Sequence, residues 1–507
     1  MRATLHLERD FRIAEVDPRL FGSFVEHLGR VVYGGIYEPG HPTADARGFR
    51  GDVLALVREL GVPVIRYPGG NFACGVRWED TVGPPEQRPR RLDLAWKSIE
   101  PNAFGLNEFA AWAREAGSAP MMALNLGTRG VEAALDLLEY CNHPGGTAAS
   151  DLRRRHGVPD PLDVRLWCLG NELDGPWQVG QKTADAYGQL ARETAKAMKF
   201  LDPTLELVAC GSSTQKMATF PDWEATVLDH CYDYVDYLSL HTYCQNLEDD
   251  PAEFLAASAG VDAFIRSVVA TCDHVKARKR SPRTIHLSFD EWNVWFHSVE
   301  ADRSAPRWTV GPRLLEDVYT LEDALVVGCL LVTLLKHADR VKIACLAQLV
   351  NAIAPIMTAP GGAAWRQTTF YPFLHASRLG RGTVLDVRVD VPGYESRKHG
   401  PVPYLEATAV DDGRGGLTLF AVNRSTTEPL ALEVEAGGYP RLRPVQHLEL
   451  RHPDRKAANT EAAPATVVPR AAERLPEVDG DRLRLTLAPF SWNVVRLEGA
   501  RGERATP

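Results

Sequence analysis

The chain has 507 residues, and its 57 Lys and Arg residues against 66 Asp and Glu residues give a formal net charge of -9. Hydrophobic residues make up 45% of it and charged residues 24%, which is typical of a globular protein that folds in water. No basic block is longer than the short run Lys276–Arg280, so the charge pattern argues against nucleic acid as a partner.

Location and redox state can be inferred from three further features. The first residues, Met1–Asp10, alternate charged and apolar side chains and do not contain the apolar core of a secretory signal, so we expect a cytoplasmic protein. The most apolar segment, Ala324–Leu335, is shorter than the ~20 residues that span a bilayer, which predicts a buried helix and no membrane partner. The nine cysteines show no CxxC spacing, and we expect reduced core thiols rather than disulfides or a zinc site.

From Phe21 to about Gly380 the sequence repeats one unit, an apolar strand followed by a loop and a stretch with helical spacing. Such repeated units predict parallel strand pairing. The predicted strands are Leu20–Leu28, Pro63–Tyr67, Met121–Leu126, Val164–Leu169, Glu206–Ala209, Tyr234–Leu240, Thr284–Phe289 and Lys342–Leu346. Eight strands are the number that closes a (β/α)8 TIM barrel, although periodicity alone leaves a doubly wound open sheet as an alternative.

The predicted helices fit between these strands. We expect Asp52 to cap a helix that ends at Gly61, and Asn107 and Gly117 to bracket the next one. Helical spacing continues in Val131–Cys141, Thr183–Phe200, Phe220–His230, Pro251–Arg278 and Leu321–His337.

After Gly380 the pattern changes to short alternating strands separated by Gly, Pro and Asp, which predicts an all-β sandwich. These strands are Thr383–Val391, Tyr404–Val410, Leu417–Asn423, Leu430–Glu435, Val445–Leu450 and Arg482–Leu497. Residues Arg2–Ile13 also alternate, and we expect them to add strands to the sandwich. The expected domains are therefore residues 1–16 with the sandwich, a catalytic barrel over 17–380 and a C-terminal, jelly-roll-like sandwich over 381–507. Ala457–Ala472 is rich in Ala and Pro and is expected to be a surface loop.

Polar residues gather where the predicted barrel strands end, and barrel enzymes place their active sites at that face. In chain order they are Glu26, His27, Arg66, Asn71, Asn125, Asn171, Glu172, His241, Tyr243, Asp290, Glu291, Trp292, Asn293, Gln348 and Asn351.

Glu172 and Glu291 each follow a strongly apolar strand and have tryptophans nearby. A strand-end Glu can also cap a helix or pair with an Arg. Two carboxyl groups with aromatic walls, however, are what sugar hydrolysis requires, because one must donate a proton while the other is ionised. Their separation, ~5–5.5 Å for retention of configuration or ~6.5–9.5 Å for inversion, is not encoded in the sequence pattern.

Several motifs identify a family resemblance. They are Phe21-Gly22-Ser23-Phe24-Val25-Glu26-His27, Arg66-Tyr67-Pro68-Gly69-Gly70-Asn71-Phe72, Leu169-Gly170-Asn171-Glu172, Ser239-Leu240-His241-Thr242-Tyr243, Asp290-Glu291-Trp292-Asn293 and Gln348-Leu349-Val350-Asn351. In this order they resemble the retaining α-L-arabinofuranosidases of glycoside hydrolase family 51, and the resemblance extends over nearly the whole chain, sandwich included.

The resemblance implies a role for each matched residue. Glu172 would be the general acid/base and Glu291 the nucleophile, with Arg66 keeping Glu291 ionised. His241 would lie near the nucleophile, although a histidine satisfied by backbone groups is an alternative. Trp96 and Trp295 match aromatic pocket walls, with simple core packing as the alternative. The residues that would hold furanose hydroxyls are Glu26, Asn71, Asn171, Tyr243 and Gln348. Cys74 departs from the small hydroxyl residue expected at its position.

The expected function is exo-acting release of terminal, non-reducing α-L-arabinofuranosyl residues by double displacement, from oligosaccharides derived from arabinoxylan or arabinan. The resemblance implies no metal or organic cofactor, and a homo-oligomer, either a hexamer or a trimer of dimers. The alternatives are a β-xylosidase or an endo-acting glucan or xylan hydrolase on the same barrel, and a non-catalytic carbohydrate-binding barrel. A metal-dependent hydrolase would require clustered ligands, and a serine hydrolase a Gly-x-Ser-x-Gly elbow, neither of which the sequence contains.

Overall fold

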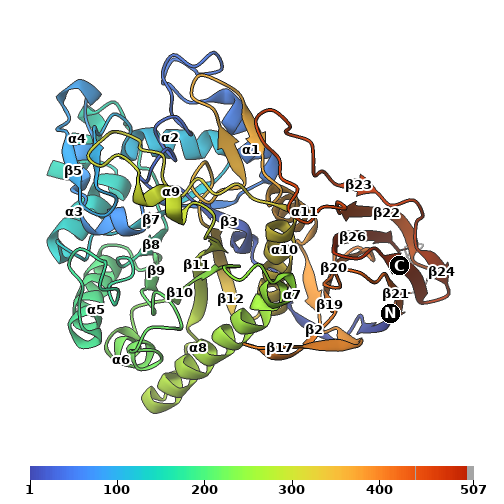
Figure 1. Cartoon of the computed structure of the whole chain (residues 1–507). Helices are drawn as coiled ribbons and strands as arrows, with labels where there is room; N and C mark the ends of the chain where they lie inside the picture. The colour runs from blue at the N-terminus through green and yellow to red at the C-terminus, as the bar shows by residue number, and fades with distance from the viewer. Residues whose placement is uncertain (440, 500–507) are drawn as a thin grey trace, which may run out of the picture.

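Eight parallel strands close into a barrel in the computed structural model, which describes residues 1–439 and 441–499 (Figure 1). The ring runs from β3 through β4, β7, β8, β9, β10, β11 and β12 back to β3, so the barrel prediction is confirmed and the open sheet is wrong. The strands are β3 (Gly22–Phe24), β4 (Val64–Tyr67), β7 (Ala119–Ala123), β8 (Leu166–Cys168), β9 (Glu206–Ala209), β10 (Tyr237–Cys244), β11 (His286–Val294) and β12 (Val341–Leu346).

Strands β10 and β11 extend beyond their predicted C-terminal ends, and this changes the position of predicted site residues. We expected His241 and Glu291 to follow their strands, but both lie inside them, and they are directly paired between β10 and β11. A register shift between Ser239 and His241 separates this pairing from the regular ladder below it. Such a bulge re-aims side chains without ending the strand, which an apolar run does not reveal.

The helices lie outside the barrel, and they are α1 (Gly51–Leu60), α2 (Leu106–Ala116), α3 (Val131–Asn142), α4 (Ala148–Arg155), α5 (Ala184–Leu201), α6 (Asp222–Cys231), α7 (Pro251–Leu255), α8 (Ala257–Lys279), α9 (Val299–Arg303), α10 (Leu321–Lys336) and α11 (Phe370–Leu379). Gly61 and Gly117 end α1 and α2 in the left-handed conformation, as predicted.

Both predicted N-caps are wrong by two residues. Helix α1 starts after Arg50, and Asp52 lies in its first turn, where the Arg50 guanidinium donates to the Asp52 carboxylate. Helix α2 starts after Gly105, whose N–H donates to the Glu108 carboxylate. Asn107 is thereby left to donate to the Tyr140 hydroxyl. Neither helix start has a side-chain cap of the predicted kind, because Asp52 and Asn107 lie inside the first turn and make other contacts.

Helix α8 continues α7, and together they are long and apolar enough, by length and composition, to cross a membrane. The apolar side chains Val261, Ile265, Val268 and Val275 are buried against the barrel instead. The helix is therefore amphipathic, with one face packed on the core, which is typical of the outer layer of a barrel. All nine cysteines are free and buried, as expected of reduced core thiols.

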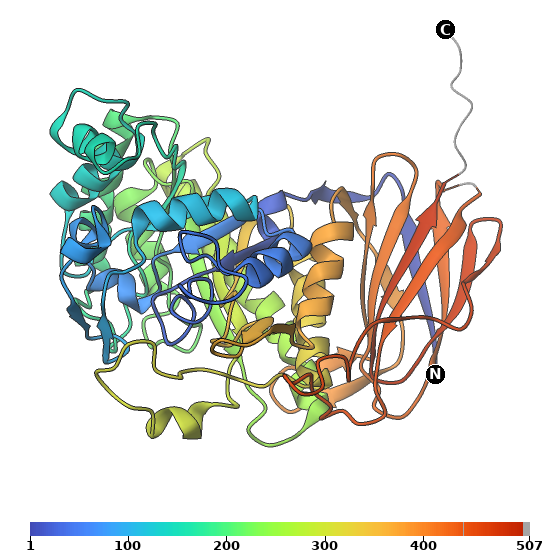
Figure 2. The ribbon, with the colours of Figure 1, turned by 90° about the horizontal axis from the view of Figure 1, so that it is seen from above.

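The second unit is a sandwich of two mainly antiparallel sheets beside the barrel (Figure 2). One sheet has the order β16-β1-β21-β25-β24, and the other β2-β15-β19-β20-β26-β22-β23. Strand β1 (Arg2–Glu8) lies between β16 (Arg388–Asp390) and β21 (Leu430–Gly437), and the blue N-terminal strand is seen among the orange and red strands in Figure 2.

The other sheet takes in the second N-terminal strand. Strand β2 (Arg12–Glu15) pairs with β15 (Thr383–Leu385). The rest of the sandwich consists of β19 (Leu405–Asp411), β20 (Leu417–Asn423), β22 (Arg443–Leu450), β23 (Arg470–Ala471), β24 (Glu477–Asp479), β25 (Arg482–Leu487) and β26 (Ser491–Glu498). Three two-stranded ribbons complete the described residues: β5 (Arg91–Asp93) with β6 (Ser98–Glu100), β13 (Ile356–Thr358) with β14 (Ala364–Arg366), and β17 (Gly393–Ser396) with β18 (Gly400–Pro403).

Three sandwich predictions need correction. The segment Thr383–Val391 forms two strands, β15 and β16, which belong to different sheets. The segment Arg482–Leu497 forms two strands in different sheets, because the chain turns at Phe490, which has a φ of 48°. The segment Ala457–Ala472 is only partly a surface loop: Ala457 and Val467 are buried, and Leu321 at the start of α10 donates its N–H to the Ala457 carbonyl.

Helix α10 separates the barrel from the sandwich (Figure 1). Every residue from Leu321 to Leu335 is buried, as its all-round apolar composition predicts. One side packs against β11 and the other against β19, β20 and β26. At Gly328 an added Cβ would lie 2.7 Å from the ring of Trp492, so the absence of a side chain there permits the close approach of β26.

Candidate active site

The structure brings all eleven predicted site residues to the C-terminal end of the barrel strands. Glu26 follows β3, Arg66 lies on β4, Asn71 follows β4, and Asn171 and Glu172 follow β8. His241 and Tyr243 lie on β10, Glu291 on β11, Trp295 just after β11 and Gln348 after β12. Trp96 comes from the turn between β5 and β6.

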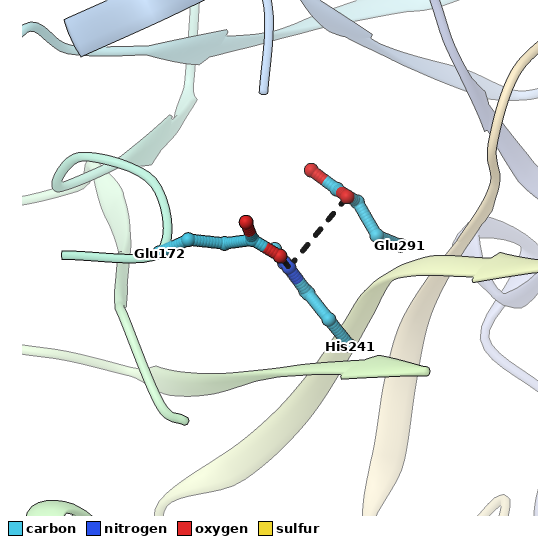
Figure 3. A group of neighbouring side chains, drawn as sticks. All are labelled: Glu172, His241 and Glu291. Carbon is cyan, nitrogen blue, oxygen red and sulfur yellow. Dashed lines mark hydrogen bonds and ion pairs between the residues drawn. The ribbon is translucent and has the colours of Figure 1, made fainter. Parts of the chain in front are cut away.

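Glu172, His241 and Glu291 form a compact group at the centre of this face (Figure 3). One carboxylate oxygen of each glutamate and one imidazole nitrogen all lie within 4.8 Å of one another. The His241 Nδ1 atom lies 2.9 Å from Glu172 Oε1 and 3.6 Å from Glu291 Oε2. Carboxyl groups this close are typical of retaining glycosidases, since inversion needs room for a water molecule.

Glu291 is held by two hydrogen-bond donors on opposite strands. Arg66 Nη1 donates to Glu291 Oε1 at 2.7 Å, and the Tyr243 hydroxyl donates to Glu291 Oε2 at 2.9 Å. Both Arg66 and Glu291 are buried, so this charge-assisted contact is little screened by water. The arrangement fixes both carboxyl oxygens of Glu291 in position, which suits a nucleophile.

Glu172 has a different environment. Burial raises the pKa of Glu172 above its ordinary value; the hydrogen bond from His241 lowers it, the nearby Glu291 charge raises it and the hydrogen bond from Trp177 lowers it. Trp177 Nε1 donates to Glu172 Oε2 at 2.7 Å. Glu172 also has a φ of 46°, in the left-handed region that side chains rarely adopt, and such strain is concentrated at functional sites. A carboxyl group with a raised pKa suits a proton donor.

His241 is positively charged in this setting. Burial alone would lower its pKa, but Glu291, Asp290 and Glu172 raise it to about 10. Both ring nitrogens of an imidazolium carry protons, so His241 donates hydrogen bonds to Glu172 on one side and to Asp290 on the other.

A second cluster surrounds Glu26. Its Oε1 accepts from Trp96 Nε1 and from the Phe72 N–H, both at 2.9 Å, and its Oε2 accepts from Gln348 Nε2 at 2.9 Å. Burial and the Glu291 charge raise the pKa of Glu26 to about 8, although these three hydrogen bonds lower it. Trp295 packs edge-on against Tyr243, with ring centroids 5.4 Å apart.

A chain of amides links Arg66 to the remaining predicted residues. Arg66 Nη2 donates to Asn171 Oδ1 at 2.7 Å, and Asn171 Nδ2 donates to Asn71 Oδ1 at 3.2 Å. Gln178 Nε2 donates to the same Asn71 oxygen and to the Asn171 carbonyl. Because these donors occupy the Asn71 oxygen, the Asn71 amide nitrogen is directed away from them.

Three residues of the site were not among the predicted site residues. Trp177 and Asp290 stood beside the two predicted carboxyl groups in the sequence, and that proximity was the available signal. Gln178 lies in an irregular loop, where no periodic pattern marks it. Cys74 is buried, and its Sγ lies 3.5 Å from the Asn171 carbonyl, so the departure at this position affects packing behind the site.

Some polar strand-end residues hold the scaffold instead. Asn125 donates to the Val76 carbonyl, and Asn351 to the Arg30 carbonyl. Asn293 donates to the Ala347 carbonyl. His27 bonds Glu100 and the Tyr67 hydroxyl in a separate buried network. Their polarity satisfies backbone and buried groups at the barrel rim.

Comparison with known proteins gives a consistent result. The α-L-arabinofuranosidase 1 domain model matches residues 56–255, and the α-L-arabinofuranosidase C-terminal domain model matches residues 290–491. The chain is 57% identical to an intracellular exo-α-(1→5)-L-arabinofuranosidase of Halalkalibacterium halodurans, over 98% of this chain and 99% of that protein. It is 56% identical to one of Acetivibrio thermocellus, again over 98% of this chain and 99% of the relative.

Among solved structures, a family 51 α-L-arabinofuranosidase from Bifidobacterium longum superposes with a TM-score of 0.94. It shares 45% sequence identity, and the match covers 98% of this chain and 99% of the other. Identity at this level over both whole chains extends to the barrel, the sandwich and the loops between them. The chain therefore belongs to the α-L-arabinofuranosidases of glycoside hydrolase family 51.

Proposed function

We propose that this protein is an exo-acting α-L-arabinofuranosidase that retains the configuration of the sugar. The observation that carries the proposal is the pair Glu172 and Glu291, with carboxylate oxygens within 4.8 Å in two different environments at the mouth of the barrel. Family membership and the names of the relatives support the sugar and the exo mode of action.

In the first step Glu291 attacks the anomeric carbon. Arg66 and Tyr243 hold its carboxylate in position. Glu172 donates its proton to the glycosidic oxygen as the glycosidic bond breaks, so the leaving group departs as an alcohol and not as an alkoxide. The product is a covalent arabinosyl ester of Glu291.

In the second step Glu172, now ionised, takes a proton from a water molecule that attacks the ester. Formation of the ester removes the Glu291 charge, and this lowers the proton affinity of Glu172. The same side chain therefore works as acid and then as base, and free arabinose leaves with its original configuration.

The polar side chains around the carboxyl pair favour a small furanose over a pyranose. Glu26, Asn71, Asn171 and Gln348 converge there, with Trp96 and Trp295 beside them, and each of the four offers an acceptor or donor to a sugar hydroxyl. For this reason we propose an arabinofuranosidase in preference to a β-xylosidase or an endo-acting hydrolase. We propose arabinan- and arabinoxylan-derived oligosaccharides as substrates, with the α-(1→5) linkage of the named relatives.

The assembly and location of the protein are part of the proposal. Relatives named intracellular and nine free cysteines support a cytoplasmic protein. We propose a homo-oligomer, and sedimentation measurements would test it. The proposed catalytic unit is residues 17–380, and we propose that the sandwich, built from residues 1–16 and from described residues after 380, supports it.

The test compares an aryl α-L-arabinofuranoside with the matching aryl β-D-xyloside. We expect the native protein to hydrolyse the arabinoside and Glu291→Ala to lose at least about 10⁴-fold in kcat. Azide added to Glu291→Ala should give an arabinosyl azide of inverted configuration. Preference for the xyloside would contradict the proposed sugar, and hydrolysis of neither would favour a binding protein.

A further inference from the structure

Asp290 is a buried carboxylate that the reaction above does not use. It immediately precedes Glu291 on β11, where side chains would ordinarily alternate between the inside and the outside of the barrel. A register shift between Phe289 and Trp292 breaks this alternation. Asp290 therefore also points inward, next to Cys168 of β8. Its exposed fraction is 0%, so it lies deeper than either glutamate and out of reach of substrate.

The contacts of Asp290 are all with groups that support the site. Its Oδ1 accepts from the Ser239 hydroxyl at 2.6 Å and lies 3.1 Å from His241 Nε2. Its Oδ2 lies 3.7 Å from Arg66 Nε. Burial alone would raise the pKa of Asp290, but Arg66 and His241 hold it below its ordinary value. Asp290 is therefore a permanent negative charge behind the imidazole ring.

We propose that Asp290 is a positioning residue that keeps His241 protonated through both steps, so that Glu172 stays free to act as the base in the second. This inference rests on the proposed function, because it concerns how the same site divides its protons between the two steps.

The argument starts from the charges that face His241. In the free enzyme these are the carboxylates of Asp290 and Glu291, and the protonated Glu172 and the Ser239 hydroxyl are neutral partners of the ring. Arg66 on β4 pairs with Asp290 and Glu291, and Asp174, in the loop after β8, is a further acidic group near the ring. Esterification of Glu291 removes one carboxylate while Glu172 becomes ionised, so Asp290 is the counter-charge that stays the same in both steps.

Without Asp290, the His241 imidazolium in the ester intermediate would lose the fixed negative charge that stabilises it. The Nδ1–H bond of His241 would then break, and the proton would pass 2.9 Å to Glu172 Oε1 to form an O–H bond. The result would be a neutral imidazole and a protonated Glu172. A protonated Glu172 takes no proton from water, so hydrolysis of the ester would slow while its formation would not.

The variant Asp290→Asn tests this, since it removes the charge and keeps the shape. With an aryl arabinofuranoside that has a good leaving group, we expect a rapid burst of phenol followed by steady turnover about 10²-fold slower than native, the scale of general-base catalysis. Azide, which needs no base, should restore phenol release and yield an arabinosyl azide with the configuration of the substrate. A matched control is Asp323→Asn, which alters a buried carboxylate that bonds His297 outside the site. It should show neither burst nor azide effect.

A merely structural role predicts a different result. Burst and steady rates would fall together in Asp290→Asn, and azide would change neither, which would overturn the proposal. A second measurement uses the native protein and does not depend on how the variant folds. In ¹⁵N-histidine NMR spectra, with His241 assigned through His241→Gln, we expect both ring nitrogens to be protonated at pH 8. A singly protonated ring would overturn the proposal.

The proposed function and the proposed role of Asp290 can be contradicted independently. If the native protein releases no phenol from the arabinofuranoside, the proposed function is wrong, whatever the NMR spectra show. If it does, and the ring of His241 is neutral, only the role of Asp290 is wrong.

Discussion

Glu172 and Glu291 are the same residue type with different chemistry, and single neighbours produce the difference. Arg66 and Tyr243 donate to both oxygens of Glu291. Glu172 lies beside His241 and Trp177, and burial raises its pKa. Roles of this kind are set by two or three contacts, so a single conservative change can alter one step without unfolding the protein.

Trp177→Phe should shift the pH dependence of the reaction. The Trp177 N–H donates to the Glu172 carboxylate and so stabilises its charged form. Removing this hydrogen-bond donor raises the pKa of Glu172, so Glu172 keeps the proton that it must donate up to a higher pH. We expect the basic limb of the kcat/KM profile to move to higher pH. Trp308→Phe, in the loop whose backbone bonds Lys97, is the control and should leave the limb in place. An unchanged limb in Trp177→Phe would contradict the hydrogen bond.

At the residue scale the sequence indicated many of the side chains that the structure brings together in the candidate site. Glu172, Glu291 and seven others lie in family motifs at the ends of apolar strands, and Trp96 and Trp295 were included from the resemblance alone. The charge of His241 could not be predicted, because it depends on carboxylates from β11 and from the loop after β8. Gln178 was missed because its hydrogen bonds to Asn71 and Asn171 form between loops, where the sequence shows no periodic hydrophobic pattern.

The elements show a similar division. Strand positions followed from apolar runs, and helix ends at Gly61 and Gly117 followed from the need for a left-handed residue. The starts of the helices and the C-terminal ends of β10 and β11 could not be predicted from the local pattern, because Arg50 and the β-bulges act through tertiary contacts. Local pattern thus fixes where an element lies, and packing against its neighbours fixes where it begins and how its side chains point.

The two helix-ending glycines offer a matched pair. An alanine Cβ at Gly117 would meet nothing within 4 Å, so Gly117→Ala should cost only the left-handed strain, ~1 kcal/mol. At Gly61 the Cβ would lie 2.8 Å from the Arg378 guanidinium, which donates to the Glu59 carbonyl. Gly61→Ala should therefore lower the thermal unfolding midpoint further than Gly117→Ala. Equal midpoints would contradict the role of Arg378.

At the scale of the whole molecule, α10 joins the two units. Its buried residues face the barrel on one side and the sandwich on the other, so neither unit covers it alone. The apolar composition of this segment predicted burial. It did not predict that two domains share the helix, because that depends on how β19, β20 and β26 pack after folding.

Gly328→Ala tests that shared interface. Alanine ordinarily stabilises a helix by ~1 kcal/mol relative to glycine. Here the Cβ would lie 2.7 Å from Trp492, and overpacking costs ~1–3 kcal/mol, so we expect a net loss of stability and a lower thermal midpoint. Trp492→Phe in the same chain should make room and recover part of the loss. A higher midpoint in Gly328→Ala alone would contradict the close packing of Trp492 against α10.

The position of β1 between β16 and β21 has a consequence for biosynthesis. His6 and its partner Glu435 lie 429 positions apart, so β1 leaves the ribosome long before its neighbours in the sheet. At ~5–20 residues per second the wait is roughly 20–90 s. Leu5 and Leu7 are buried in the folded protein, and until β1 pairs we expect them to be exposed on an open strand, which is a template for aggregation. Production of this protein should therefore respond to chaperone supply and to slower growth at low temperature, and an N-terminal fusion should be tolerated less well than a C-terminal one.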